Sequence, residues 1–275
     1  MRQLEGKVIF LTGGTDGIGF ECAKTYAKEG ASLIIAAPYN RRFILAAKEL
    51  GGDHLCIHTD VCIGDEVKSA IEQGLNRFGR LDAIHNNAGI ANPSKTLDQT
   101  SEEEWERLVN TNLKSIYHTT RYGIAALKET MGCILNTSSL VGEIGQDLHA
   151  AYTATKGGVN ALTKSMALDY APYHIRVNAV SPAGVWTSML EKWKEEQPAP
   201  SVIAEYLNAI HPLGYCPQGD VIADACTFLL SERARFITGC ILPVSGGAEL
   251  GYRKVMQAHK KALANGDGKL KANDK

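Results

Sequence analysis

The sequence predicts one α/β domain whose core is a doubly wound, seven-stranded parallel sheet with helices on both faces. Two observations carry this prediction. Seven short apolar runs alternate with stretches of helical pattern, and a chain of 275 residues with 44% hydrophobic residues can bury one large core. The expected strands cover residues 7–12, 33–37, 56–59, 83–86, 133–138, 176–180 and 241–244. We therefore expect the domain to cover residues 1–250, followed by a polar C-terminal extension at residues 251–275.

A glycine-rich turn follows the first expected strand. The run KVIFLT, typical of a buried parallel strand, leads into Gly13, Gly17 and Gly19 and then into the helical pattern FECAKTYAKEG. Glycine permits a tight turn and lets backbone N–H groups approach a pyrophosphate, whose charge is stabilised at the positive end of the helix. A purely structural turn is the alternative. The glycine-rich turn follows the first strand of a chain in which strands and helices alternate, and this position favours dinucleotide binding and a Rossmann fold.

Polar and glycine residues gather at the ends of the expected strands. Thr12, residues 86–89, Ser139 and residues 182–187 each lie at or just after such an end. In an open parallel sheet the carboxyl ends of the strands share one edge, and ligands bind outside that edge. Segments far apart in the sequence are therefore expected to form a single site.

Tyr152 and Lys156 are four positions apart in a helical stretch, and Ser139 precedes the tyrosine by thirteen. This spacing puts the ammonium near the phenol. Lowering a phenol pKa of about 10 by ~3 units takes roughly 4 kcal/mol, and a cation ~4 Å away supplies roughly that at an effective dielectric of about 20. The pair alone is also typical of a solvated helix surface. Together with the neighbouring motifs it predicts that Tyr152 is a general base.

Further motifs occur in a consistent order along the chain: TGGTDGIG at 12–19, Asp60-Val61, NNAG at 86–89, Asn112, Ser139, YTATK at 152–156 and SPAGVWT at 181–187. In this order they resemble the motifs of the short-chain dehydrogenase/reductase family, over roughly residues 5–250. The segments SLVGEIGQ and GGAELGY are similar to those of the group that contains 17β-hydroxysteroid dehydrogenase type 14 and L-fucose dehydrogenases. The resemblance implies an NAD(P)-dependent oxidoreductase that acts on CH–OH groups and assembles as a homotetramer.

The resemblance also implies roles for four catalytic residues. Tyr152 would take the proton of the substrate alcohol, and Ser139 would hydrogen-bond the reacting oxygen, where negative charge develops during reduction. Lys156 would hold the nicotinamide ribose, and Asn112 would support an ordered water that links Lys156 to solvent. Taken alone, Asn112 and Ser139 are typical cap or turn residues.

The cofactor is expected to contact the strand ends and the glycine turn. The implied residues are Gly13, Thr15, Asp16, Gly17, Ile18, Gly19, Ala37, Arg41, Asp60, Val61, Asn87, Ala88, Gly89, Tyr152, Lys156, Pro182, Val185 and Thr187. Asp60 resembles the residue that contacts the adenine ring, and as a bare sequence feature it is also typical of a turn or cap.

The choice between NADP and NAD depends on the end of the second strand. An acidic residue there binds the ribose 2′-hydroxyl and repels a 2′-phosphate, but this chain has Ala37 at that position. Arg41 and Arg42 follow and are suited to a 2′-phosphate, whereas Asp16 stands in the glycine turn where NADP enzymes often carry a basic residue. Solvated arginines at a helix start are the alternative. The balance favours NADP, with NAD as the other possibility.

The loop before Tyr152 bears on the substrate. Residues 142–151 place Glu143, Gln146 and His149 within ten positions of the tyrosine, together with Asp147. Such donors and acceptors favour a polyhydroxylated ligand, because a steroid pocket is mainly apolar. A polar loop that faces water is the alternative. We therefore expect a sugar substrate, most simply an L-fucose-like aldose, with a hydroxysteroid or other apolar secondary alcohol as the alternative.

Two segments after Tyr152 also bear on ligand binding. Trp186 and Trp193 are expected to cover an apolar sugar face, and residues 187–213 are predicted to form a mobile lid or an ordinary solvated helix end. The family's usual Pro-Gly pair appears as Pro182-Ala183-Gly184. Alanine tolerates a positive φ poorly, so this substitution predicts strain at Ala183 and weakens the predicted contacts of Val185 and Thr187.

Composition excludes several other classes of function. A formal charge of −1 gives no electrostatic basis for binding nucleic acid or an anionic membrane. No apolar stretch approaches ~20 residues, and MRQLEGKVIF lacks a signal-peptide pattern, so a cytoplasmic protein with small-molecule partners is expected. The cysteines form no CxxC pair and the eight histidines no HExxH motif, which predicts buried thiols and no metal.

Two non-enzymatic functions remain as alternatives. A redox sensor could keep the nucleotide-binding fold without turnover, and the basic segment after Gly251 could bind nucleic acid. A pure binding protein has no need for the set of Asn112, Ser139, Tyr152 and Lys156. This set favours an enzyme.

Overall fold

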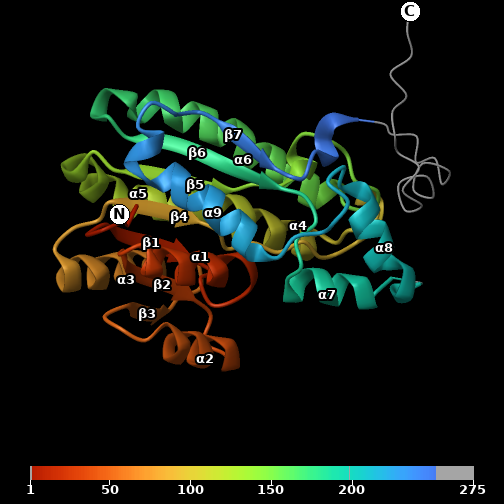
Figure 1. Cartoon of the computed structure of the whole chain (residues 1–275), viewed down its shortest axis with the longest axis horizontal. Coiled ribbons are helices and arrows are strands. Elements are labelled where there is room, and N and C mark those ends of the chain that lie inside the picture. The colour runs from red at the N-terminus through yellow and green to blue at the C-terminus, as the bar shows by residue number, and fades with distance from the viewer. Residues whose placement is uncertain (1, 198, 252–275) are drawn as a thin grey trace, which may run out of the picture.

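Seven strands form a single parallel sheet in the order β3-β2-β1-β4-β5-β6-β7 (Figure 1). The computed structural model describes residues 2–197 and 199–251. Within them the strands are β1 (Val8–Thr12), β2 (Ser32–Ala37), β3 (Leu55–His58), β4 (Ala83–Asn86), β5 (Cys133–Thr137), β6 (Arg176–Pro182) and β7 (Ile241–Val244). This is the predicted doubly wound Rossmann arrangement, in a single α/β domain. The predicted polar extension lies outside the described residues beyond Gly251.

The strands form where buried apolar runs occur in the sequence. All five residues of β1 are buried, as are the last five of β2, because helices cover both faces of a parallel sheet. The predicted bounds of β4 and β7 are confirmed to the residue. Strand β6 continues to Pro182, two residues further than the sequence predicts, because pairing with β7 extends to Val244.

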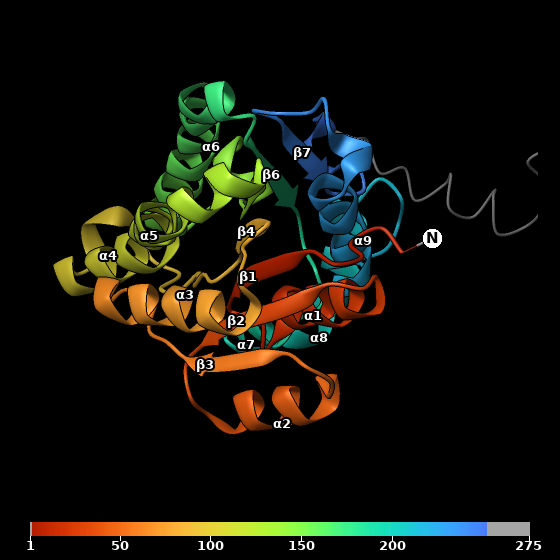
Figure 2. The same cartoon turned by 90° about the vertical axis from the view of Figure 1, so that its left-hand side faces the viewer.

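Helices cover the sheet in two layers (Figure 2). On one face, α1 (Gly17–Lys28) and α9 (Gly219–Leu230) enclose a core that includes Leu11 and Ile35. On the other, α3 (Gly64–Phe78), α5 (Ser115–Thr130) and α6 (Ala150–Tyr170) enclose a core that includes Phe10 and Ile84. The alternation of neighbouring β1 residues between the two cores is the period of two expected for a strand.

The remaining helices lie at the edges of the sheet. Helix α2 (Arg41–Leu50) lies below the edge strand β3, and α4 (Glu102–Val109) precedes a π-helical turn at Asn110–Lys114. Helices α7 (Ser188–Glu195) and α8 (Pro200–Ile210) stand beyond one end of the sheet (Figure 1). Residues 187–213 thus form two helices, while their action as a lid stays a prediction. None of the described helices is long and apolar enough to span a membrane.

Side-chain hydrogen bonds cap the N-termini of α1 and α7, which lie near the same end of the sheet. Asp16 accepts a hydrogen bond from the Gly17 N–H at 2.8 Å at the start of α1, and Thr187 accepts one from the Leu190 N–H at 3.2 Å at the start of α7. Such caps satisfy N–H groups that have no partner within the helix. They place the positive ends of α1 and α7 on the same side of the domain.

Candidate active site

A cavity of about 1100 Å³ lies at the carboxyl ends of β1 and β4, where the strand order reverses. This is the switch point at which doubly wound sheets bind their ligands. Most of the predicted site residues line it: Gly13, Thr15, Asp16, Gly17, Ile18, Gly19, Asp60, Val61, Asn87, Ala88, Gly89, Ser139, Gln146, His149, Tyr152, Lys156, Pro182, Val185 and Thr187. Five predicted residues are not part of its lining: Ala37, Arg41, Asn112, Glu143 and Trp186.

Glycines make room for close backbone approach in the turn after β1. A Cβ atom at Gly19 would lie 2.2 Å from the Gly13 carbonyl oxygen, and one at Gly13 would lie 3.0 Å from the Ala88 Cα atom. Gly13 also has a φ of 67°, in the left-handed region. The turn is therefore packed against the end of β4 with its N–H groups at the start of α1, an arrangement that fits a pyrophosphate.

Hydrogen bonds hold the ends of β1 and β4 together beneath the cavity. The Thr12 hydroxyl oxygen accepts from the N–H groups of Asn87 and Ala88, both at 3.0 Å, and the Asn87 amide donates to the Thr12 carbonyl at 3.2 Å. Thr12 is buried, so these bonds are shielded from water. The floor of the cavity is thus built from both halves of the NNAG motif and the last residue of β1.

Asn112 clamps the loop after β4 rather than lining the cavity. Its side-chain oxygen accepts from the Ile90 N–H at 2.8 Å, and its amide donates to the Ile90 carbonyl at 2.9 Å and to the Thr155 hydroxyl at 3.0 Å. A Cβ atom at Gly89 would lie 3.4 Å from the Asn112 oxygen and 3.6 Å from Lys156 Nζ. The π-helical turn therefore places Asn112 beside Lys156, with its predicted role in a proton path untested.

Tyr152 and Lys156 lie on the same face of α6. Lys156 Nζ is 5.7 Å from the centre of the Tyr152 ring and donates to the Thr137 carbonyl at 2.8 Å. Burial raises the pKa of the Tyr152 phenol, partly opposed by a hydrogen bond from Ser139. Burial also lowers the pKa of Lys156 to about 8. The two hydroxyl groups of Ser139 and Tyr152 can together bind one alcohol or carbonyl oxygen.

The sequence predicts that Lys156 lowers the pKa of Tyr152 and that an oxidised nicotinamide adds to this effect; burial of the phenol acts in the opposite direction. Lys156 makes its hydrogen bond to Thr137, and desolvation disfavours the charged forms of both side chains. A phenolate therefore needs a further positive charge near Tyr152. An oxidised nicotinamide supplies such a charge when it is bound.

The end of β2 forms the part of the cavity that bears on cofactor choice. Ala36, Pro38 and Asn40 line it, whereas Ala37 is buried behind them and Arg41 is exposed outside. Arg42 lines the cavity and pairs with Asp16. The Asp16 carboxylate also accepts from the Ser188 hydroxyl at 2.5 Å. Asp16 thus joins the starts of α1, α2 and α7, a role that the sequence does not reveal.

Asp60 forms a turn and also lines the cavity. It lines the cavity, and its carboxylate accepts a hydrogen bond from the Cys62 N–H at 2.9 Å, which forms the turn before α3. The turn keeps the carboxylate at the edge of the site. Its predicted contact with the adenine ring stays a prediction.

Polar and apolar residues together line the part of the cavity around Tyr152. His149 is buried, and its ring nitrogens lie 3.1 Å from the Ser94 hydroxyl and 2.8 Å from the Asp147 carbonyl. Its ring stands edge-on to Tyr152, with centroids 6.4 Å apart. Gln146 also lines the cavity, as do the apolar residues Leu140, Val141 and Ile144 that precede it. Helices α7 and α8 contribute Met189, Leu190, Trp193, Tyr206, Leu207 and Ile210.

The sequence does not reveal which neighbours of Tyr152 face the cavity. Glu143 is exposed outside it, and Trp186 is not part of its lining either; the backbone N–H of Trp186 donates to the Pro217 carbonyl at 2.9 Å. Trp193, one helical element later, lines the cavity instead. Trp186 precedes α7 and Trp193 lies within it, so a helical pattern in residues 188–195 is the signal that could have separated the two tryptophans.

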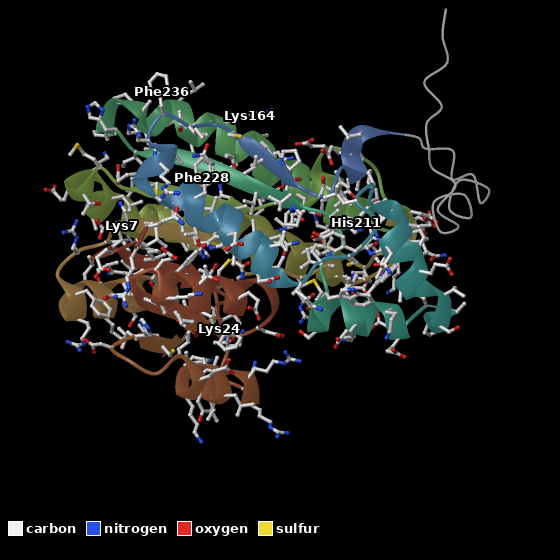
Figure 3. All side chains as sticks on the ribbon, viewed as in Figure 1. Lys7, Lys24, Lys164, His211, Phe228 and Phe236 are labelled. Atoms are coloured by element: carbon white, nitrogen blue, oxygen red, sulfur yellow. The ribbon has the colours of Figure 1, made fainter. Side chains whose placement is uncertain are left out.

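His211 anchors α8 over the strand ends. It is buried near the end of the domain that carries α7 and α8, away from Lys7 and Phe236 (Figure 3). Its Nδ1 atom lies 2.6 Å from the Leu207 carbonyl at the last turn of α8. The missing Cβ of Gly184 leaves room for the imidazole, since a Cβ there would lie 3.2 Å from its Cε1 atom.

The Pro182-Ala183-Gly184 segment shows no backbone strain of the predicted kind. Among the described residues other than glycine, only Met131, Leu148 and His174 have a positive φ. Ala183 therefore adopts an ordinary conformation, and the alanine does not displace the chain. Pro182, Val185 and Thr187 line the cavity as the resemblance implies.

A dinucleotide-sized cavity with a glycine cradle, a tyrosine and a lysine on one helix face defines a nicotinamide-dependent oxidoreductase. Comparisons with known proteins give its family. Residues 13–249 match the family model described as enoyl-(acyl carrier protein) reductase. The chain belongs to the short-chain dehydrogenase/reductase family, and it is an NAD(P)-dependent oxidoreductase that acts on CH–OH groups.

Individual relatives agree with this assignment. L-Fucose dehydrogenase from Bos taurus is 39% identical over 254 residues, which cover 92% of this chain and 93% of the relative. The 3-ketoacyl-(acyl-carrier-protein) reductase from Brucella melitensis complexed with NADH has 33% identity and a TM-score of 0.82, over 90% of this chain and 99% of that one. The aldohexose dehydrogenase from Thermoplasma acidophilum has 30% identity and a TM-score of 0.84, over 93% and 98%.

Proposed function

We propose that this protein oxidises a hydroxyl group of a free sugar, most simply an L-fucose-like aldose. The carrying observation is that Gln146, from the loop before Tyr152, lines the cavity. Its exposed amide offers a donor and an acceptor to sugar hydroxyls, whereas both ring nitrogens of His149 already have partners in Ser94 and Asp147. The likeness to L-fucose dehydrogenase and to an aldohexose dehydrogenase supports the same substrate class.

The chain's own residues divide the work of the reaction. Tyr152 accepts the proton of the substrate hydroxyl, and Ser139 keeps that oxygen in place by a hydrogen bond. Lys156 contributes positive charge beside Gly89, with Asn112 holding the loop that carries this glycine. The glycine turn and the residues after β4 hold the dinucleotide. The bound nicotinamide supplies the hydride acceptor.

The first experiment is a turnover assay of the purified protein with L-fucose, other aldoses and estradiol, each with NAD and NADP. We expect reduced nicotinamide to form with a sugar. Activity with estradiol alone would overturn the sugar proposal and leave the oxidoreductase assignment intact. A matched variant sharpens the result: Gln146→Leu is expected to raise KM for the sugar by roughly two- to tenfold per lost hydrogen bond and to leave KM for the cofactor unchanged.

The second candidate substrate class is an apolar secondary alcohol. The wall formed by α7 and α8 favours it, because Met189, Leu190 and Leu207 present apolar groups to the cavity. The same assay decides between the classes. A sugar is expected to use this wall for its apolar face, stacked on Trp193, so Trp193→Ala should weaken turnover of the sugar and of the apolar alcohol alike.

For the cofactor we propose NADP over NAD. The neutral Ala37 leaves no carboxylate at the end of β2 to repel a 2′-phosphate, and Arg42 offers a cation at the cavity. The pairing of Arg42 with Asp16 opposes this, because the carboxylate competes for the same guanidinium. A modest preference for NADP is therefore expected.

Arg42→Ala is expected to lower kcat/KM with NADP by roughly two- to fivefold and to leave kcat/KM with NAD nearly unchanged. The effect is small because a half-exposed charge contact contributes about 1 kcal/mol or less. Steady-state kinetics with both cofactors measure it. Arg41→Ala is the matched control, since Arg41 is exposed outside the cavity. Equal losses in both variants would remove Arg42 from cofactor selection.

We also propose the assembly and location that the resemblance implies, a homotetramer in the cytoplasm with small molecules as its ligands. Light scattering of the purified protein measures the assembly. A monomeric mass at micromolar concentration would exclude the tetramer.

A further inference from the structure

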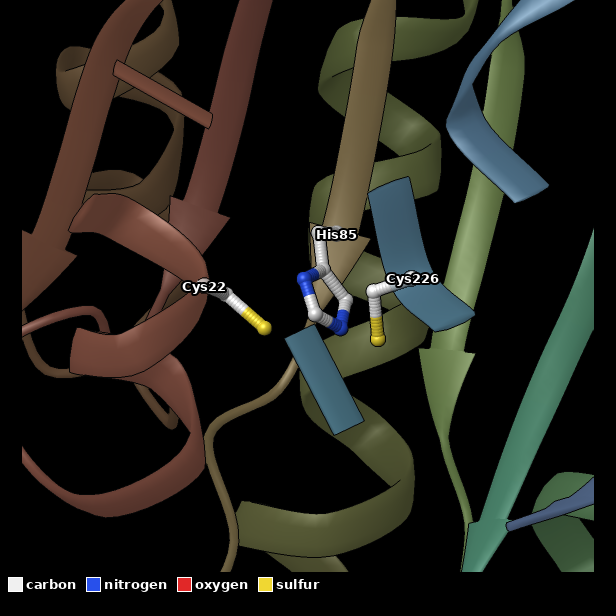
Figure 4. A group of neighbouring side chains, drawn as sticks. All are labelled: Cys22, His85 and Cys226. Carbon is white, nitrogen blue, oxygen red and sulfur yellow. The ribbon is translucent and has the colours of Figure 1, made fainter. Parts of the chain in front are cut away.

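Three possible metal ligands meet in the core behind the active site. Cys22 comes from α1, His85 from β4 and Cys226 from α9, and Figure 4 shows the imidazole between the two thiols. All three side chains are fully buried, and their ligand atoms lie within 4.8 Å of one another. None of them lines the active-site cavity. This cluster therefore has no role in the reaction described above.

The hydrogen bonds of His85 fit a neutral imidazole that carries its proton on Nε2. The Thr137 hydroxyl donates to the Asn87 side-chain oxygen at 3.4 Å, so its oxygen is left to accept from His85 Nε2 at 3.0 Å. The proton of the neutral imidazole is then on Nε2. Nδ1 keeps its lone pair and faces the Tyr26 hydroxyl at 3.0 Å. Metal-binding histidines are typically oriented in this way, with the second nitrogen donating to an oxygen.

We propose that Cys22, Cys226 and His85 Nδ1 bind a structural Zn²⁺ ion, with the Tyr26 oxygen as the fourth ligand. Two sulfur atoms and an imidazole nitrogen are the donor set that zinc prefers in closed structural sites. Two thiolates, a neutral imidazole and a neutral phenol around Zn²⁺ carry no net charge. Because an uncompensated charge in a dry core is strongly unfavourable, this balance favours a divalent over a monovalent ion.

The required geometry is within reach of small side-chain rotations. Tetrahedral zinc with bonds of about 2.0–2.3 Å places its ligand atoms roughly 3.5–3.8 Å apart. One ligand atom from each of Cys22, His85 and Cys226 already lies within 4.8 Å of the other two, so the longest separation has to shorten by about 1.3 Å at most. Tyr26 is fully buried and is held near the cluster by its bond to His85.

The position of the cluster indicates what the ion would do. It would join α1, which follows the glycine turn, to β4 and α9. His85 also contacts Thr137, whose carbonyl holds Lys156 Nζ at 2.8 Å. A metal there stabilises the scaffold beneath the cofactor and takes no part in proton transfer.

Metal analysis of the full-length protein tests the proposal independently of activity. Expression in zinc-supplemented medium under reducing purification is expected to give about one zinc per chain. Expression with cobalt is expected to give the intense visible bands and thiolate charge-transfer absorption of tetrahedral Co²⁺ bound to sulfur. Both readouts use the wild-type chain, so they do not depend on how a core variant folds.

Variants then assign the ligands. Cys226→Ala is expected to lower the bound metal by more than ~10-fold. Cys56→Ser and Cys240→Ser, which alter half-buried cysteines outside the cluster, are the controls and are expected to keep it. Wild-type protein with no zinc and no cobalt bands would overturn the proposal. So would metal that survives Cys226→Ala, or a Cys22–Cys226 disulfide in the reduced, purified protein.

Discussion

Tyr152→Phe is expected to lower kcat by about 10²–10⁴-fold, the usual contribution of general acid–base catalysis. Phenylalanine keeps the ring that packs near His149 and removes only the hydroxyl that accepts the proton. The dissociation constant of the reduced cofactor should therefore stay unchanged. Steady-state turnover with the best substrate measures the first quantity, and titration of the cofactor's fluorescence measures the second.

The control for this variant lies on the same helix. Tyr170→Phe removes a phenol at the opposite end of α6, remote from the cavity, and should leave kcat unaltered. Full turnover by Tyr152→Phe would exclude the proton-transfer role and with it the mechanism. A loss of cofactor affinity equal to the loss of kcat would instead indicate a damaged binding site.

The same tyrosine determines the direction of the pH dependence. Burial raises its pKa, so the neutral phenol persists to higher pH than in an exposed tyrosine. Oxidation of an alcohol needs the phenolate, and kcat/KM for oxidation should rise with pH across the neutral and alkaline range. Reduction needs the phenol and should show the opposite slope. The two pH profiles, taken on one preparation, check this assignment.

Lys156→Met is expected to abolish most activity and yet to stabilise the fold near neutral pH. Burial lowers the pKa of Lys156 from 10.5 to about 8. Such a shift corresponds to roughly 2–4 kcal/mol of lost stability for the charged form, offset by about 1 kcal/mol from its hydrogen bond to Thr137. The net gain in the free energy of unfolding should be about 1–3 kcal/mol at pH 7.

The sign of the pH dependence follows from linkage. The folded protein holds this proton less tightly than the unfolded chain, so the wild type is destabilised in full below pH 8. This destabilisation decreases as pH rises from about 8 to about 10.5, and the difference in the free energy of unfolding between Lys156→Met and the wild type should decrease with it. Urea unfolding at several pH values measures the difference.

Lys164→Met provides the matched control, because Lys164 is exposed on the same helix (Figure 3). It should change neither the stability near pH 7 nor its pH dependence by more than a few tenths of a kcal/mol. If Lys156→Met proved less stable than the wild type at pH 7, the charged lysine would be stabilised by its surroundings. The depressed pKa would then be excluded.

Much of the scaffold follows from local sequence pattern. Strands β4 and β7 are predicted to the residue because each is a short run with polar or glycine residues within two positions of both ends. The convergence of Ser139 and the NNAG motif on one rim needs no structure either, since parallel strands carry their carboxyl ends to a common edge. Tyr152 and Lys156 share a helix face because of the helical period alone.

The surroundings of those residues do not follow from the sequence. Asp16 forms an ion pair with Arg42 and a hydrogen bond with Ser188. These three residues meet only when α1, α2 and α7 come together. The choice of Trp193 over Trp186 as a cavity residue depends on where α7 begins and how it is turned. The pKa of Lys156 depends on its burial, which local spacing does not contain.

By itself the sequence determined the order of strands and helices along the chain and the edge at which the site forms, and it predicts the residues of the proton-transfer set, because each depends on local periodicity and on the geometry of parallel sheets. Tertiary structure alone decided the electrostatic state of Tyr152 and Lys156 and the meeting of Cys22, His85 and Cys226. Those properties arise from burial and from contacts between segments that are distant in the chain. A short stretch of sequence therefore does not predict them.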